Sequence, residues 1–103
     1  MSVPVPQRIF RPSPGNTKVV TVSATATSVA FLGSGANFRV VNATGGIVLF
    51  GLGDSTYSAT TSDTPILSGS AEVFTRDPSS ETNISIRTVS GTGTVYVQDG
   101  EGS

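Results

Sequence analysis

The sequence feature that most constrains the fold is an alternation of apolar and polar residues with a period of two, which recurs in short segments. In residues 18–26, Val or Ala occupies the even positions from 20 to 26, whereas Thr and Ser occupy positions 21, 23 and 25. Because successive side chains of a strand point to opposite faces, this segment predicts a half-buried strand. The other predicted strands are residues 28–32, 37–42, 47–50, 72–76, 83–89 and 94–98, with an edge segment at 65–69 and one further short strand around 57–60.

Small and turn-forming residues separate these segments. Thr, Ser and Gly occur 14, 15 and 12 times and account for 41 of the 103 residues. Thr and Val favour strands, and Gly and Ser favour turns, so this composition indicates seven to nine short strands. A chain of this length fits one hydrophobic core. We therefore predict an all-β fold with a single antiparallel β-sandwich, of immunoglobulin-like or jelly-roll-like type.

Three local patterns give finer predictions. The apolar run 47–50 predicts a strand covered on both faces. The turn residues at 42–46 predict a hairpin between 37–42 and 47–50, and those at 90–93 predict a hairpin between 83–89 and 94–98. Residues 99–103 are expected to form a solvated tail.

The first 16 residues differ from the rest, because four of the six prolines lie there. Proline removes a backbone donor and fixes φ, so residues 1–16 predict an extended arm rather than a strand, followed by a β-sandwich domain at 17–103. Within the arm, Ile9 and Phe10 stand between Arg8 and Arg11. The arm either lies over its own domain or stays disordered, or it docks in a groove on a neighbouring subunit with Ile9 and Phe10 as anchors.

Whole classes of catalytic side chain are missing. The chain has no His and no Cys, which excludes Ser-His and Cys-His nucleophile pairs and zinc sites of the His/Cys kind. The carboxylate pairs Asp54 with Asp63 and Glu72 with Asp77 remain available for glycoside hydrolysis, but the chain has no Trp and only two Tyr to hold a sugar. We predict that it is not an enzyme and that it uses no cofactor or metal. Residues 51–55 could form a calcium or phosphate loop, but a tight connection is the better interpretation.

Charge and hydropathy argue against two kinds of partner. The net charge is -1 and the basic residues are scattered, so nucleic acid is not expected to bind. No run approaches the roughly 20 apolar residues that span a bilayer, so no membrane contact is expected. The sequence instead predicts contacts with other proteins. The candidate contact residues are Arg8, Ile9, Phe10, Arg11, Asp54 and Tyr57.

Most large apolar residues are assigned to packing. Tyr96, inside a strand, is expected to pack in the core or on a sheet face. The candidate core consists of Phe31, Phe38, Ile47, Leu49, Phe50, Val73, Phe74, Ile84, Ile86, Val95 and Val97.

The order of several short motifs resembles that of small virion proteins of tailed bacteriophages. The motifs are Phe38 to Asn42, Phe50-Gly51, Gly53 to Ser55, Ala59-Thr60, Ser62-Asp63, Pro65-Ile66, Gly69, Glu72 to Phe74, Ser90 to Thr92, Val95 to Val97 and Gly100 to Gly102.

This resemblance covers roughly residues 38–102 and implies a structural role. It predicts a capsid decoration or cement protein that is made in the host cytoplasm and lies on the virion surface, where it binds the major capsid protein or other virion proteins. It also implies a homo-oligomer or many copies on a symmetric shell. A neck or tail adaptor or fibre component is the alternative, and a carbohydrate-binding module is a third. The resemblance supplies no active site.

Overall fold

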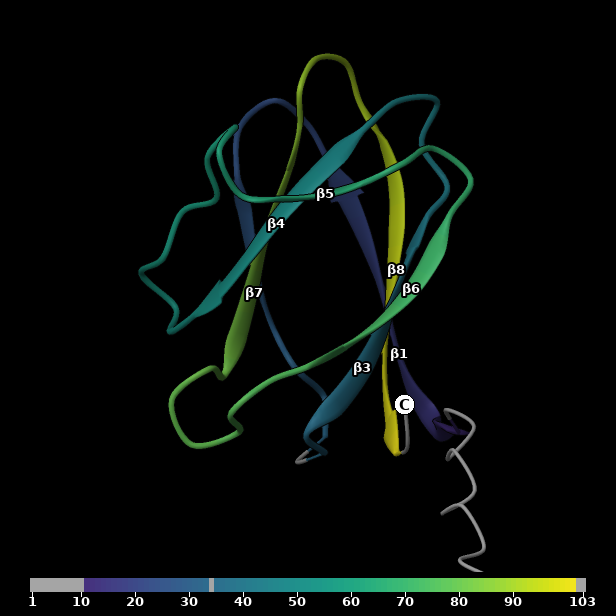
Figure 1. The fold of residues 1–103 in the computed structure, drawn as a ribbon, viewed down its shortest axis with the longest axis vertical. Helices are drawn as coiled ribbons and strands as arrows, with labels where there is room; N and C mark the ends of the chain where they lie inside the picture. Colours follow the sequence, from purple (N-terminus) through teal and green to yellow (C-terminus); the bar gives the residue numbers. More distant parts are fainter. Residues whose placement is uncertain (1–10, 34, 102–103) are drawn as a thin grey trace, which may run out of the picture.

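The computed structural model describes the backbone of residues 11–33 and 35–101, and the side chains of 15–33 and 35–100. These residues form eight strands in two four-stranded antiparallel sheets, and no helix (Figure 1). The strand order is β1-β8-β3-β6 in one sheet and β2-β7-β4-β5 in the other. The strands are β1 (Arg11–Val22), β2 (Thr27–Ala30), β3 (Asn37–Asn42), β4 (Val48–Gly53), β5 (Thr64–Ile66), β6 (Ala71–Thr75), β7 (Asn83–Thr88) and β8 (Gly93–Glu101).

The pairing of these strands follows a nested scheme. β1 pairs with β8, β2 with β7, β3 with β6 and β4 with β5, and the successive pairs alternate between the two sheets. This arrangement corresponds to one long antiparallel ribbon wrapped around a core, which is the jelly-roll form of the β-sandwich. The predicted fold class is therefore confirmed.

The core lies between the inner faces of the two sheets. Val20, Val40 and Ile86 are among its members with less than a tenth of their surface exposed. Four phenylalanines meet at one end, where the ring centroids of Phe50 and Phe74 lie 4.7 Å apart and those of Phe31 and Phe38 lie 4.9 Å apart. The core cluster is completed by Val22, Val29, Val48, Ile66, Ile84, Val95 and Val97, with Leu52 packed against it.

The beginning of β1 differs from the sequence-based assignment. Residues 11–16 were assigned to the arm, but they belong to β1, and Arg11 pairs with Glu101. The register shifts between Pro12 and Thr17, and Gly15 in this stretch has a φ of 77°. An edge strand tolerates prolines and an irregular register because only one side of it has a neighbour. Residues 1–10 of the predicted arm lie outside the described residues.

Both predicted hairpins are wrong. β3 and β4 lie in different sheets, and so do β7 and β8. Asn42 shows why the first connection crosses between the sheets, because its buried side-chain amide donates to the carbonyls of Gly46 and Ile66, both at 2.9 Å. Its Oδ1 accepts bonds from the backbone N–H and the hydroxyl of Thr44. The turn residues thus mark where a strand ends, but buried polar contacts decide where the chain goes next.

Three smaller expectations also change. Residues 57–60 form no strand, and Ile47 is 43 % exposed because β4 begins one residue later. The expected tail at 99–103 is wrong for residues 99–101, which extend β8 and place Asp99 in the interior. The expectation that the 47–50 run is covered on both faces holds for its last three residues, which are buried together with Gly51.

Candidate functional site

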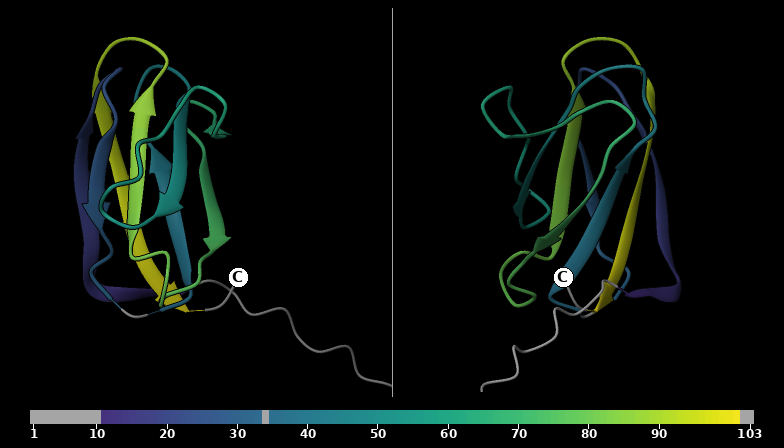
Figure 2. Two further views of the ribbon diagram at one scale, coloured as in Figure 1. Left: turned by 90° about the vertical axis from the view of Figure 1, so that its left-hand side faces the viewer. Right: turned by 45° about the vertical axis from the view of Figure 1, so that its right-hand side comes forward.

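The two outer faces of the sandwich differ in what covers them. The connection between β4 and β5, residues 54–63, lies across the outer face of the β2-β7-β4-β5 sheet, and Figure 2 shows it in front of β7 in its left panel. Ala59, in the middle of this connection, is buried, and its N–H donates to the hydroxyl of Ser85 at 2.8 Å. Ser85 is itself buried on the outer side of β7. This face is therefore closed by the chain's own loop.

Tyr57 fixes this loop to the sheet. A Cβ added at Gly51 would lie 2.3 Å from Cε2 of the tyrosine ring, so the ring rests directly on the backbone of β4. The phenol O–H donates to both carboxylate oxygens of Asp63 at 2.8 Å. This hydrogen bond to the carboxylate is the main reason that the pKa of Tyr57 is raised above its ordinary value. Tyr57 is 37 % exposed, and its described contacts hold the loop; that it also contacts another protein stays a prediction.

Asp54 has a similar local role at the start of the loop. Its Oδ1 accepts bonds from the hydroxyl and the backbone N–H of Thr56. These bonds, the side-chain bond first, stabilise the ionised form and lower the pKa of Asp54. Its partner in the proposed carboxylate pair, Asp63, accepts bonds from Tyr57 and from the Thr60 N–H. Both carboxylates therefore shape the connection. The interpretation of 51–55 as a tight connection holds for residues 54 and 55 only, because residues 51–53 are the end of β4.

The outer face of the β1-β8-β3-β6 sheet carries an apolar row instead of a loop. The pairings place Val19 opposite Tyr96, Tyr96 opposite Val41, and Val41 opposite Ala71, so one row crosses all four strands. Val19 is 62 % exposed and Tyr96 is 37 % exposed. Tyr96 therefore lies on a sheet face and not in the core, which were the two positions expected for it. We call Val19, Tyr96, Val41 and Ala71 the apolar row.

A polar row lies next to it on the same face. Nε of Arg39 donates to Oε1 of Gln98 at 2.6 Å, and Nε2 of Gln98 donates to the hydroxyl of Thr17 at 3.4 Å. Arg39 is the only charged residue among the described residues that point outward from these four strands. The face is therefore nearly uncharged, which suits contact with another protein surface.

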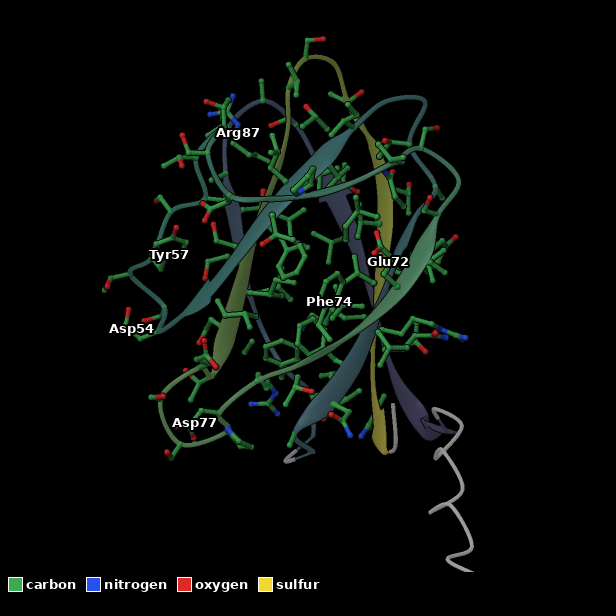
Figure 3. All side chains as sticks on the ribbon, in the orientation of Figure 1. Asp54, Tyr57, Glu72, Phe74, Asp77 and Arg87 are labelled. Atoms are coloured by element: carbon green, nitrogen blue, oxygen red, sulfur yellow. The ribbon has the colours of Figure 1, made fainter. Side chains whose placement is uncertain are left out.

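An open pocket lies where the two sheets separate, between the edge strands β5 and β6. Its volume is about 280 Å³. Phe50, Leu52 and Phe74 give it an apolar floor, and Figure 3 shows the Phe74 side chain directed into the space between the sheets. The polar part of the lining consists of Asp63, Thr64, Thr75 and Glu81.

The fold does not place Glu72 and Asp77, the other carboxylate pair considered for catalysis, next to each other. Figure 3 shows Glu72 midway along β6 and Asp77 in the turn at the end of the molecule. Asp77 accepts bonds from the hydroxyl and N–H of Ser79, which lower its pKa. Within the described ranges, no three acidic side chains gather where they could hold a metal ion.

A buried ion pair at the same end of the molecule was missed by sequence reasoning. Nη2 of Arg76 lies 3.8 Å from Oδ2 of Asp99, and both side chains are at most 3 % exposed. The guanidinium also donates to the carbonyls of Gly33 and Glu81 and stacks 4.1 Å above the ring of Phe31. The pair ties two loops to the end of β8, so we interpret it as structural. No local sequence pattern marks it, because its two partners are far apart in the chain.

The remaining predicted contact residues lie at the beginning of the chain. Arg8, Ile9 and Phe10 are outside the described residues, and of Arg11 only the backbone, paired with Glu101, is described. No helix in residues 11–33 or 35–101 is long and apolar enough to cross a membrane. Comparison of the chain with protein-family models, curated proteins and solved structures found no match.

Proposed function

We propose that this protein is a non-enzymatic, protein-binding module, and that its principal contact surface is the outer face of the β1-β8-β3-β6 sheet. The observation that carries this proposal is the apolar row, which crosses an outer sheet face that no described segment covers. Exposed apolar residues that are contiguous across several strands are typical of interaction sites, whereas single exposed apolar residues are ordinary.

Within this class, the proposed role is that of a head decoration protein of a tailed phage, bound to the outer surface of the major capsid protein lattice. Two considerations support it: the motif order from residue 38 onward, and a jelly-roll fold, which is common among viral capsid domains. A fold hosts many functions, so the fold supports the role only together with the surface. Repetition on a symmetric shell would multiply modest contacts of this small module through avidity.

A matched pair of substitutions tests the surface. Val19→Asp places a charge in the apolar row, and Leu67→Asp places the same charge at a site that is equally exposed, 60 % against 62 %, but outside the row. Purified phage heads lacking this protein are incubated with each variant, and occupancy is measured by quantitative mass spectrometry. We expect Val19→Asp to lose most of its binding and Leu67→Asp to retain it. Equal binding by both variants would contradict the proposed surface.

The same measurement separates the alternatives. A decoration protein should be present in hundreds of copies per virion, and a neck or tail component in about twelve or fewer, because these structures have low rotational symmetry. The third alternative, a carbohydrate-binding module, predicts signals on a glycan array that depend on Tyr96. Tyr96→Ala in that assay distinguishes a sugar-binding face from a protein-binding one.

A further inference from the structure

We propose that the pocket between β5 and β6 receives Ile9 and Phe10 of a second copy of this chain, with Arg8 of that copy against the pocket's carboxylates. The protein would then associate with itself by exchanging its first ten residues.

The lining of the pocket matches this segment in polarity. Leu52 and Phe74 are only partly buried, so the floor presents apolar surface that an inserted side chain would cover. A volume of about 280 Å³ accommodates side chains of the size of Ile and Phe. An isoleucine and a phenylalanine side by side are the kind of anchor that such a pocket holds.

The charges also match. Asp63 and Glu81 contribute two carboxylates to the lining, and among the described residues neither of them is in an ion pair. The segment supplies a guanidinium immediately before its two apolar residues, at Arg8. By contrast, the apolar row has Arg39 beside it and would place like charges together. The acidic pocket is thus the better electrostatic partner for this segment.

Chain length decides between the protein's own pocket and that of another copy. Pro12, Gly100, Asn37 and Thr75 lie in one row across the sheet, so the start of β1 is three strand spacings, roughly 14 Å, from the pocket residue Thr75. Consecutive Cα atoms are about 3.8 Å apart, so the Cα of Phe10 lies at most roughly 8 Å, and that of Ile9 at most roughly 11 Å, from the Cα of Pro12. The pocket lies beyond Thr75, between the sheets. Both Cα atoms therefore fall short of Thr75, so Ile9 and Phe10 cannot fill the pocket of their own chain together, whereas the pocket of another copy is accessible to both.

The location is tested by photo-crosslinking of the full-length chain. A benzoyl-phenylalanine replaces Phe10, which keeps an aromatic anchor, and the protein is mixed with an isotopically labelled copy before irradiation. Mass spectrometry then identifies the crosslinked peptides. We expect crosslinks between chains, at Leu52 or Phe74. Crosslinks confined to one chain, crosslinks to the apolar row, or no crosslinked dimer at the highest soluble concentration would overturn the proposal.

The energetics are tested by sedimentation of full-length variants. Phe10→Ser should weaken self-association about tenfold or more, as expected for a buried anchor. Arg8→Glu and Glu81→Gln should each weaken it about threefold, as for a pair at the rim, and Arg8→Glu combined with Glu81→Arg should restore it. Arg87→Glu, a charge reversal outside the pocket, is the control and should change nothing. Glu81→Gln retains the oxygen that accepts the Asp77 N–H, so the fold should be preserved.

Self-association that is indifferent to Phe10→Ser would also overturn the proposal. Both experiments use the purified chain alone. Their failure would therefore leave the proposed capsid-binding surface untouched, and failure of the particle-binding test would leave this one untouched.

Discussion

The outer faces of the two sheets differ in the size of their side chains and in whether the chain's own loop covers them. On the β2-β7-β4-β5 sheet, the outward positions Gly51, Gly53 and Ser85 are small, and the loop at 54–63 packs onto them. On the β1-β8-β3-β6 sheet, the outward positions Val19 and Tyr96 are large and apolar, and no described segment lies on them. The first face contributes to the stability of the monomer. The second adds little to it, which is the physical reason to assign it to a partner.

The largest loss of unfolding free energy is expected at the buried ion pair of Arg76 and Asp99, which lies on neither outer face. Arg76→Ala removes the counter-charge of the buried Asp99 carboxylate together with the bonds to Gly33 and Glu81. A buried charge left without its partner typically costs about 3 to 5 kcal/mol of unfolding free energy. Urea unfolding should show this loss, and Arg87→Ala, at a half-exposed arginine, should lose well under 1 kcal/mol. A similar small loss for both variants would contradict a structural role for the ion pair.

The next largest loss of stability is expected from a substitution on the covered face, the outer face of the β2-β7-β4-β5 sheet. Gly51→Ala places a Cβ against the ring of Tyr57, so the loop must move or the strand must bend. Such overpacking costs about 1 to 3 kcal/mol. The control is Gly45→Ala, because a Cβ there would meet nothing within 4 Å and the residue has no positive φ. Thermal unfolding of the two variants compares them directly. Equal stability would mean that the loop is not held against the sheet.

Sequence reasoning reached the fold class but not the covering loop, and particular residues show why. The alternation at 37–42 predicted β3 with its bounds, because burial of every second side chain is written into the local sequence. The partner of β3 was not predicted, because pairing with β6 and β8 depends on residues about 30 to 60 positions away in the chain. Asp99 and Gly51 were misjudged for the same reason, since their burial comes from packing against distant segments.

A change of pH should destabilise the loop on the covered face and leave the exposed face unchanged, and this effect on stability should be smaller than those of the substitutions above. The lowered pKa of Asp54 means that its hydrogen bonds stabilise the folded state above the unfolded pKa of about 3.9, and that this contribution is lost as the pH falls through the lower folded value. The raised pKa of Tyr57 gives the opposite dependence of stability on pH. Its contribution is present below the ordinary value of 10.0 and is lost as the pH rises through the folded value.

Amide hydrogen exchange in the loop at 54–63 should therefore be slowest at intermediate pH, after correction for the intrinsic rate. It should accelerate at either extreme before exchange in β1 and β8 does. Tyr57→Phe should abolish the alkaline acceleration while retaining the ring that packs on Gly51. Simultaneous acceleration across both sheets would show that the loop does not open separately.

The smallest expected effect bears most directly on the exposed face. Val19→Thr replaces one β-branched side chain by another at a position that is 62 % exposed, so strand propensity and burial are nearly unchanged. The unfolding free energy should shift by at most about 0.5 kcal/mol. If the row were part of the monomer's own packing, the added hydroxyl would lose its hydration and the loss would exceed 1 kcal/mol. A neutral result in urea unfolding, together with weaker binding of Val19→Thr to phage heads, would assign the row to a partner and not to the fold.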